Sequence, residues 1–485
     1  MDDCLLAIDL GTSTVKVVAF DLDGRPLATF QQEIPLYSPD PMALESDAAA
    51  WWEIVARGLR TVLTTVPAGA VRAVGLCGFM HTLVPIDARG RPLDRPLLWP
   101  DQRARTALLA LAPYQEQIVQ IQGRPPTTLS CLAKLAWLRQ HRPDVLARAT
   151  AWLPPKDFLR FCLTGELATD ARDAAGTMLT EAATGQWSEA LLALVGLRPA
   201  HLPPIRSPTA IAGLVTPTAA RATGLRPGTP VVVGSGDWFT TIVGSGCYLP
   251  ERTCFYMGTA GILGAFVSRA ALESLGPTRH FGTVTATGAA LRWARALLGA
   301  AATFADLCQT AAESPPGARG LLFLPHLMGE RGGQYNPDAR GAFIGLTLAH
   351  TPADLLRAVL EGCAFCLWTA CQPLLAEHDP GRLLAMGGGA QSPLWRSIMA
   401  AVFQRPLLVP DCLEGGARGA ALLAAVGVGL CQGIATTLDR WVRIVDHTSP
   451  DPALVAIYAQ ALERYRLADR RLFPLWPQLA AGPSG

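Results

Sequence analysis

The sequence predicts an α/β protein of two domains, and three observations support this prediction. A chain of 485 residues exceeds the length at which one hydrophobic core usually stops growing. Helical patterns such as residues 49–66 alternate with short apolar strands such as residues 73–77. A strand followed by a Gly-Thr turn occurs at the start of the chain and again past its middle, which indicates a weak internal duplication. We therefore expect domains at residues 1–245 and 246–485.

The first elements of each half are strands that end in glycine turns. Apolar runs at residues 4–8 and 15–20 and the turn DLDG predict a β-hairpin that continues as a meander. In the middle of the chain, the strand at residues 231–233 runs into GSGD, which ends at Asp237. The strand at residues 253–257 then leads into a second Gly-Thr turn, GTAG.

Composition narrows the classes of function and partner. A net charge of +2 with 16% charged residues leaves no electrostatic footprint for nucleic acid or for a membrane surface. The start, Met1-Asp2-Asp3, lacks the basic region of a signal peptide, and we find no uninterrupted apolar run of about 18 residues. We expect a cytoplasmic protein. The 12 cysteines are scattered, and the pair Cys363 and Cys366 is expected to be buried rather than to bind zinc.

The segment LAIDLGTSTVK, residues 6–16, carries groups that suit phosphate and Mg²⁺. Backbone N–H groups and hydroxyls directly after a strand can approach an oxyanion, so Gly11, Thr12 and Ser13 are candidate ATP contacts. Asp9 could hold Mg²⁺ directly or through water, and Lys16 could meet the terminal phosphate. By itself, the segment fits equally well a plain hairpin turn with a solvated lysine.

Two glycine elements of the second half complete the nucleotide prediction. Gly258 and Thr259 repeat the strand-to-turn pattern, and two such elements in separate halves favour a nucleotide bound by both domains. The cluster Gly387, Gly388 and Gly389 follows an apolar run, where missing side chains would let adenine lie on the backbone. A plain tight loop is the alternative for that cluster.

Five motifs in the expected order resemble the FGGY carbohydrate kinases over residues 5–425. They are LAIDLGTSTVK, GSGD, FYMGTAGIL, the stretch at residues 329–346 and MGGGAQSPLWR. The resemblance implies two ribonuclease-H-like domains of the actin/Hsp70 ATPase type flanking a cleft. Sugar would bind mainly to the first domain and ATP mainly to the second, with ATP and Mg²⁺ as cofactors and a homodimer as the family expectation.

The same resemblance implies that Asp237 is the catalytic base, which contacts the sugar and accepts its hydroxyl proton. Partial burial of Asp237 would raise its pKa toward a useful value. Without the resemblance, an N-cap of the following helix would be an equally good interpretation of this aspartate.

Motifs on the sugar side are similar to those of xylulose kinases within the family. GFMHT and LWPDQR imply that Met80, His81 and Asp101 contact the sugar. Phe79, Thr82 and Pro100 depart from the usual Gln, Gly and Asn, and Met-His followed by a hydroxyl residue is also similar to gluconate kinases. These departures bear on sugar identity and leave the phosphoryl chemistry intact.

The expected reaction is transfer of the ATP γ-phosphoryl group to a small-molecule sugar, D-xylulose giving D-xylulose 5-phosphate. Gluconate, ribulose or another polyol is the alternative acceptor, and a non-catalytic actin/Hsp70-like nucleotide switch is a further alternative. We expect Lys156 and Asp157 to form a structural ion pair, and Glu330, Arg331 and Arg340 to fold a loop.

Overall fold

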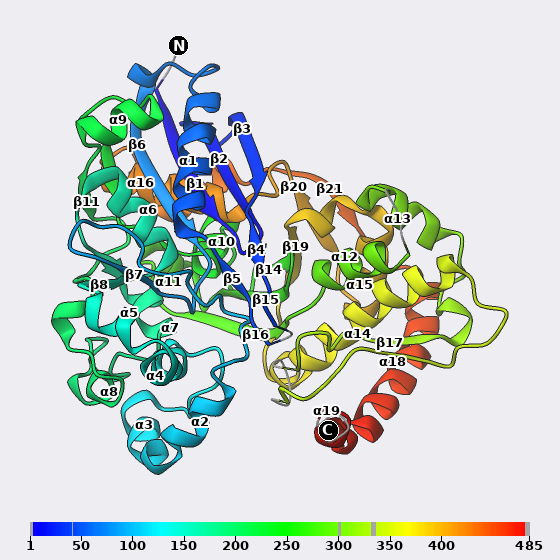
Figure 1. Ribbon diagram of the computed structural model, residues 1–485. Coiled ribbons are helices and arrows are strands. Elements are labelled where there is room, and N and C mark those ends of the chain that lie inside the picture. The colour runs from blue at the N-terminus through cyan, green and yellow to red at the C-terminus, as the bar shows by residue number, and fades with distance from the viewer. Residues whose placement is uncertain (1–2, 41, 299–301, 331–335, 481–485) are drawn as a thin grey trace. The chain divides into compact units, whose positions relative to one another are not determined.

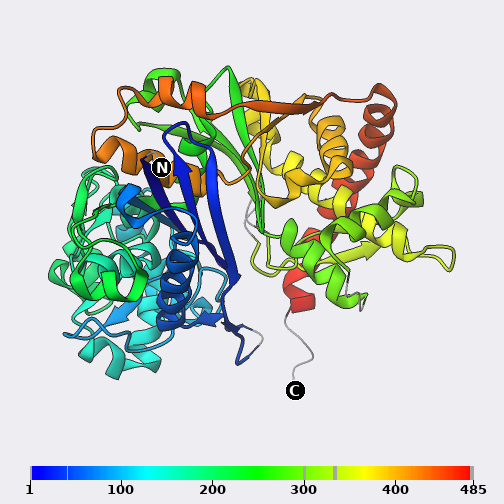
Figure 2. The ribbon, with the colours of Figure 1, turned by 90° about the horizontal axis from the view of Figure 1, so that it is seen from above.

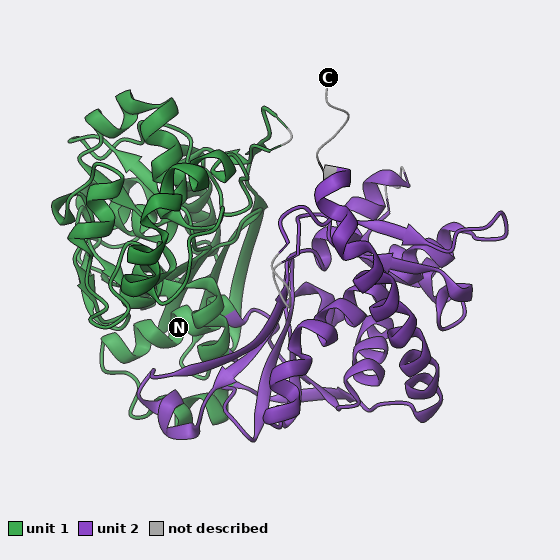
Figure 3. Cartoon of the chain, turned by 90° about the horizontal axis from the view of Figure 1, so that it is seen from below, with its two compact units in different colours: residues 1–244, 416–441 green, residues 245–415, 442–485 purple. Residues whose placement is uncertain are grey.

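The computed structural model describes residues 3–40, 42–298, 302–330 and 336–480, and these form two compact units (Figures 1 and 3). Unit 1 comprises residues 1–244 and 416–441, and unit 2 comprises residues 245–415 and 442–485. The sequence assigns everything after residue 245 to the second domain. The segment 416–441 instead folds with unit 1.

Close backbone contact explains where this segment belongs. It contains most of helix α16 (Gly415–Gly427), and two of its glycines, Gly419 and Gly427, face backbone of unit 1. A Cβ on Gly419 would lie 1.9 Å from the Thr240 carbonyl oxygen, and a Cβ on Gly75 would lie 1.9 Å from the Ala420 carbonyl oxygen. Small residues on both sides therefore let α16 lie directly on unit 1.

Unit 1 is built on one mixed sheet with the strand order β11-β12-β6-β1-β2-β3, and β13 also pairs with β6. Strands β1, β6 and β12 are parallel, whereas β2, β3 and β11 are antiparallel to their neighbours. The strands of unit 1 are β1 (Cys4–Leu10), β2 (Thr14–Asp21), β3 (Pro26–Glu33), β4 (Leu36–Tyr37), β5 (Glu45–Ser46), β6 (Val71–Gly78), β7 (Val84–Ile86), β8 (Ala151–Leu153), β9 (Thr169–Asp170), β10 (Ile205–Arg206), β11 (Ile211–Leu214), β12 (Pro230–Val232) and β13 (Ser235–Gly236).

Helices cover this sheet and also form a separate small core. The helices are α1 (Ala48–Val62), α2 (Arg105–Leu111), α3 (Gln115–Gln122), α4 (Cys131–His141), α5 (Pro143–Arg148), α6 (Pro155–Thr164), α7 (Ala171–Gly176), α8 (Glu189–Leu194), α9 (Pro217–Thr223), α10 (Asp237–Ser245), α16 and α17 (Ile434–Trp441). Asp47 caps α1 by accepting from Ala49 N–H, and α1 packs along β2 and β3 (Figure 2). Leucines of α2, α4 and α8 share a second core around Trp152.

Unit 2 repeats the same sheet plan, with the order β16-β15-β14-β19-β20-β21. Its elements are β14 (Arg252–Met257), β15 (Gly261–Phe266), β16 (Thr278–Val284), β17 (Leu322–Leu324), β18 (Ala342–Ile344), β19 (Arg382–Met386), β20 (Leu407–Pro410), β21 (Ile444–Thr448), α11 (Arg269–Glu273), α12 (Gly288–Leu297), α13 (Phe304–Ala312), α14 (Pro352–Glu377), α15 (Pro393–Phe403), α18 (Pro452–Leu472) and α19 (Trp476–Ala480).

In both sheets the first three strands in sequence form an antiparallel meander, β1-β2-β3 in unit 1 and β14-β15-β16 in unit 2. Two further strands run parallel to the first strand of the meander, and an antiparallel strand forms the far edge of the sheet. The predicted α/β class is confirmed, and the weak duplication seen in the sequence is a duplication of topology.

Helix α14 runs through the core of unit 2. Within the ranges that the structure describes, it is the one helix long and apolar enough to cross a membrane, and two thirds of its apolar window are buried. It packs against β16, α13, β17 and α15. Asp354, Arg357 and Glu361 are buried on it, and Arg357 donates to Glu361 at 2.8 Å. This pairing and packing are those of a core helix.

Candidate active site

Three parallel strands of unit 1 end at the same place and bring Asp9 and Asp237 together. Asp9 is in register with Cys77, and Gly78 at the end of β6 pairs with both Leu10 and Gly236. Asp237 follows Gly236 directly as the first residue of α10. Because the carboxyl ends of parallel strands meet at one sheet edge, two carboxylates far apart in sequence become neighbours.

The electrostatics of Asp237 suit a proton acceptor. Burial and the negative charge of Asp9 raise the pKa of the Asp237 carboxyl to about 7, against a smaller lowering by the backbone N–H of Trp238. That N–H donates to Asp237 Oδ1 at 2.7 Å. Asp237 is the first residue of α10 and accepts from the N–H of the next residue, whereas an N-cap would precede the helix and accept from a residue further along. The raised pKa is that expected of a general base, and the catalytic role of Asp237 stays a prediction.

The β1–β2 hairpin that carries the predicted phosphate contacts is tied to a neighbouring loop. Gly11 N–H donates to the Thr14 carbonyl oxygen at 2.8 Å, which closes the turn. The Thr12 hydroxyl accepts from Trp99 Nε1 at 2.7 Å. Lys16 lies opposite Asp9 in the strand register. The hairpin, with Ser13 in its turn, is thereby joined to the segment that contains Asp101.

Met80 and His81 lie beside the strand end that leads into Asp237. A Cβ on Gly236 would meet Met80 Sδ at 2.6 Å, and one on Gly176 would meet Met80 Cε at 2.9 Å. Met80 therefore fills the space between these two glycines. His81 adopts a left-handed backbone with φ of 60°, and its Nδ1 lies 2.8 Å from the Gly176 carbonyl oxygen. A carbonyl only accepts, so Nδ1 carries the proton and Nε2 is the acceptor of the neutral ring.

Asp101 is placed differently from the other predicted sugar ligands. Its side chain is fully buried, with Oδ2 accepting from Leu44 N–H at 2.9 Å and from Arg103 at 2.7 Å. Arg103 also reaches Glu45 at 2.7 Å. In this arrangement Asp101 holds the loop together, and a direct contact with sugar stays a prediction.

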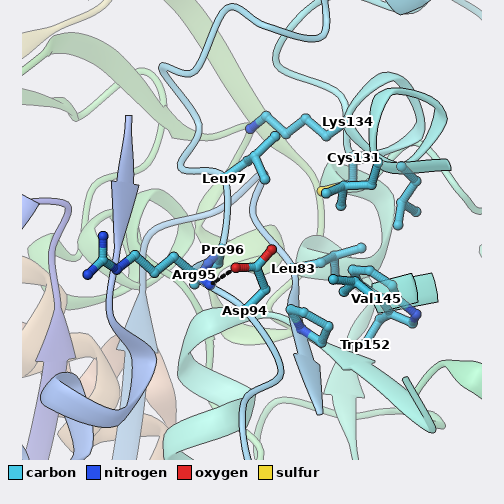
Figure 4. Close-up of a pocket in the computed structure, with 12 residues that line it drawn as sticks. Leu83, Asp94, Arg95, Pro96, Leu97, Cys131, Lys134, Val145 and Trp152 are labelled. Atoms are coloured by element: carbon cyan, nitrogen blue, oxygen red, sulfur yellow. Dashed lines mark hydrogen bonds between the residues drawn. The ribbon is translucent and has the colours of Figure 1, made fainter. Parts of the chain in front are cut away.

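Lys134, one of three lysines in the chain, joins two loops of the candidate sugar site. Its Nζ donates to the carbonyl oxygens of His81 at 2.7 Å and Leu98 at 2.8 Å. The side chain also lines a small, mostly apolar pocket together with Leu97 and Trp152 (Figure 4). The lining of this pocket includes none of the residues that the sequence assigns to sugar, phosphate or metal.

Lys156 lies at the centre of a buried charge cluster behind the candidate catalytic strand. Its Nζ approaches Asp157 at 2.7 Å, Asp173 at 3.0 Å and Asp170 at 3.2 Å. Asp170 in turn accepts from the Ser235 hydroxyl of β13 at 2.6 Å. The expected Lys156–Asp157 pair is confirmed. Asp170 and Asp173, one helical turn apart, were not predicted as further partners, although their i, i+3 spacing was a usable signal.

In unit 2 the two glycine elements become neighbours. Strands β14 and β19 are parallel, with Tyr256 opposite Met386, so both loops leave the sheet at one edge. Cβ atoms on Gly387 and Gly389 would lie 3.0 and 2.9 Å from the Met257 carbonyl oxygen. A Cβ on Gly388 would meet nothing within 4 Å, so this glycine borders open space.

The Gly-Thr turn is braced from the following helix α12. Arg292 donates to the Thr259 hydroxyl at 2.9 Å, and the Thr287 hydroxyl donates to the Gly258 carbonyl oxygen at 2.9 Å. The loop that begins at Glu330 is closed by backbone hydrogen bonds with Asn336, and Arg340 donates to the Pro337 carbonyl oxygen. This confirms the loop role of Glu330 and Arg340, whereas Arg331 lies outside the described residues.

Comparison with known proteins identifies the family. The model of the FGGY carbohydrate kinase N-terminal domain matches residues 4–244, and that of the C-terminal domain matches residues 271–428. The chain belongs to the FGGY family of carbohydrate kinases. This FGGY kinase is 32% identical to the xylulose kinase of Escherichia coli, over 97% of this chain and 99% of that protein.

Solved structures agree with this assignment. A gluconate kinase from Lactobacillus acidophilus has a TM-score of 0.85 at 25% identity, covering 98% of this chain and 99% of that chain. A ligand-bound xylulose kinase from the same organism has a TM-score of 0.84 at 25% identity, covering 98% and 100%. The expected actin/Hsp70-like ATPase fold is confirmed. The FGGY kinase is a phosphotransferase that uses ATP and an alcohol acceptor, which sets aside the non-catalytic switch.

Proposed function

We propose that this FGGY kinase phosphorylates D-xylulose at its terminal hydroxyl, with Asp237 as general base. The observation that supports it best is the convergence of Asp237, Asp9 and Met80 at the end of β6 and β13. A carboxylate with a pKa of about 7 can accept the hydroxyl proton as the γ-phosphoryl group transfers. The alcohol oxygen then forms the new P–O bond, and ADP leaves with the electron pair of the broken bond.

The residues around Asp9 fit a magnesium ion. Asp9 and Asp237 are close enough for the charge of one to raise the pKa of the other, a repulsion that a divalent cation would relieve. The backbone start of α16 also approaches Asp9, because a Cβ on Gly416 would lie 2.9 Å from its Oδ2. When bound, Mg²⁺ supplies positive charge to the phosphates. Gly11, Thr12, Ser13 and Lys16 would contact the γ-phosphate, and Gly258, Thr259 and residues 387–389 the rest of ATP.

We assign sugar recognition to the two loops that contain His81 and Leu98, whose carbonyl oxygens both accept from Lys134. His81 Nε2 would accept from a sugar hydroxyl and Met80 would form an apolar wall, while Asp101 would act directly or by ordering Arg103. The motifs GFMHT and LWPDQR, which are similar to those of xylulose kinases, support D-xylulose as the phosphoryl acceptor. The hydroxyl of Thr82, which is buried and has no hydrogen-bond partner among the described residues, supports gluconate as the second candidate. We also propose a cytoplasmic location and a homodimer.

A substrate panel tests the proposal. Purified protein with ATP and Mg²⁺ should release ADP at least tenfold faster with D-xylulose than with L-xylulose, D-ribulose, L-ribulose, gluconate, glycerol or erythritol. A preference for gluconate would keep the kinase mechanism and replace the acceptor. Equal, sugar-independent ADP release across the panel would contradict a carbohydrate acceptor at this site.

The raised pKa of Asp237 predicts the pH dependence of turnover. The base accepts a proton only when ionised, so kcat should fall tenfold per pH unit below the pKa of Asp237 and level off above it. That pKa is about 7 without metal, and bound Mg²⁺ would lower it by offsetting the charge of Asp9, while burial would still hold it above the ordinary carboxyl value. Rates at saturating sugar and ATP from pH 5 to 9 would measure this. Weaker binding of ATP or Mg²⁺ at low pH is excluded as the cause if the rate at pH 6 does not rise when the concentrations of both are increased. A kcat that stays flat over the whole range from pH 5 to 8 would contradict the assignment of the base.

A further inference from the structure

A second cluster of reactive side chains lies in unit 2, apart from the glycine loops. His326 and Glu330 follow β17, and Cys366 lies on α14, and one ligand atom from each falls within 4.8 Å of the others. His326 Nδ1 is 3.0 Å from Glu330 Oε2, and Cys366 Sγ is 3.7 Å from the same oxygen. Ligand atoms bound tetrahedrally to zinc lie about 3.3–3.8 Å apart, so small movements would bring this set into place.

The imidazole of His326 is already oriented as in a metal site. Its Nε2 lies 2.8 Å from Asp469 Oδ1 on α18, so Nε2 donates to that carboxylate. Nδ1 therefore faces Glu330 and Cys366. Histidines that bind metals typically donate their other ring N–H to a carboxylate, which fixes the tautomer and the ring. Here the carboxylate comes from a helix more than a hundred residues away in the chain.

The cluster is buried, and the Tyr465 hydroxyl next to it lacks a strong hydrogen-bond partner among the described residues. His326 is 3% exposed and Cys366 is 4% exposed. Tyr465 is fully buried with its hydroxyl beside the Cys366 thiol, and it has no other hydrogen-bond partner among the described residues. Leaving a buried hydroxyl without a strong partner costs free energy. An oxygen ligand in a fourth position, either this hydroxyl or a water bound to it, would remove that cost.

We propose that His326, Glu330 and Cys366 bind one zinc ion, with Asp469 positioning His326. An imidazole, a thiolate and a carboxylate together suit Zn²⁺ better than the hard cations Mg²⁺ and Ca²⁺. Binding releases the Nδ1 and thiol protons to solvent and forms metal bonds in their place, without redox chemistry. The ion would fasten α14 to the loop after β17. The prediction of no zinc at Cys363 and Cys366 rested on the apolar helical stretch around them, which has no second CxxC and no nearby histidine pair.

A buried ion triad is the competing interpretation. Burial lowers the pKa of His326, but its hydrogen bonds with Asp469, Cys366 and Glu330 outweigh burial and raise the pKa to about 12. In the absence of metal, the imidazolium would thus bridge Glu330 and Asp469. The two interpretations differ in what occupies the Nδ1 side, a proton or a metal ion.

Metal analysis of the purified, tag-free full chain separates them. We expect about one zinc per chain by mass spectrometry, and after exchange with Co²⁺ a thiolate-to-cobalt charge-transfer band. Cys366→Ala should lose the zinc and the band. Cys363→Ala should keep both, because Cys363 is equally buried on the same helix and points to the Ala286 carbonyl oxygen at 3.5 Å.

Two results would overturn the zinc site, and neither depends on kinase activity. One is wild-type protein that binds neither zinc nor cobalt in direct titration, which requires no variant to fold. The other is Cys366→Ala protein that retains stoichiometric zinc. Either outcome would leave the protonated triad as the state of this cluster. ADP release with the sugar panel is measured separately, so a failed zinc site and a failed kinase assignment remain distinguishable.

Discussion

Replacing Asp237 with asparagine should lower kcat about a hundred- to ten-thousand-fold, which is the range for loss of a general base. The amide oxygen of the substituted side chain can still accept from the Trp238 N–H, so the start of α10 should persist. ATP affinity, measured by calorimetry, should change less than threefold. ADP release at saturating sugar gives the turnover.

The matched control for this variant is Asp87→Asn. Asp87 lies in an exposed turn of unit 1, where it accepts from Arg91 at 2.9 Å. The same chemical change there should leave kcat within a factor of two. If Asp237→Asn retained most of its turnover while binding ATP normally, Asp237 would not be the base.

Replacing Lys156 with methionine should reduce the free energy of unfolding by about 3–5 kcal/mol, because removing one partner from a buried ionic cluster leaves uncompensated charge. Asp157 keeps Arg160, and Asp170 keeps the Ser235 hydroxyl. Asp173, already held above its usual pKa by burial, loses its ammonium partner. Urea denaturation followed by tryptophan fluorescence would measure the loss.

A double variant isolates the cause of this loss. Lys156→Met combined with Asp173→Asn removes one buried negative charge together with the ammonium, so part of the lost free energy should return. The single variant Asp173→Asn completes the double-mutant cycle, which gives the interaction free energy between Lys156 and Asp173. A single Lys156→Met variant within about 1 kcal/mol of wild type would contradict the view that the lysine is needed to balance these carboxylates.

Local patterns explain what could be predicted. The β1–β2 hairpin, the Gly-Thr turns and the strand before Asp237 depend on neighbouring residues, since turns require glycine and strands require short apolar runs. The Lys156–Asp157 pair is likewise adjacent in sequence. The family followed from the same local motifs, because they keep their order along the chain.

Contacts between distant segments explain what could not be predicted. Residues 416–441 were assigned to the second domain, since their sequence shows small residues but not the unit 1 backbone against which those residues pack. The motif around Asp101 does not show that its Oδ2 accepts from the Leu44 N–H, 57 residues away, as well as from Arg103, and a direct contact of Asp101 with sugar stays a prediction. His326 and Cys366 are separated by the loop and helix between them, so their proximity has no sequence signature.

The sequence by itself determined the α/β class, the duplicated strand-turn elements and the kinase family, because each of these is encoded in short runs of residues. The prediction that Asp237 is the base came from the family resemblance, since the residues around it fit a helix cap equally well. Only the tertiary structure decided that Asp9 raises the pKa of Asp237, that Lys134 and Lys156 anchor the loops and strand around it, and that His326 meets Cys366. Charge interaction and burial depend on distance in space, and the folded chain sets that distance through its sheet order and helix packing.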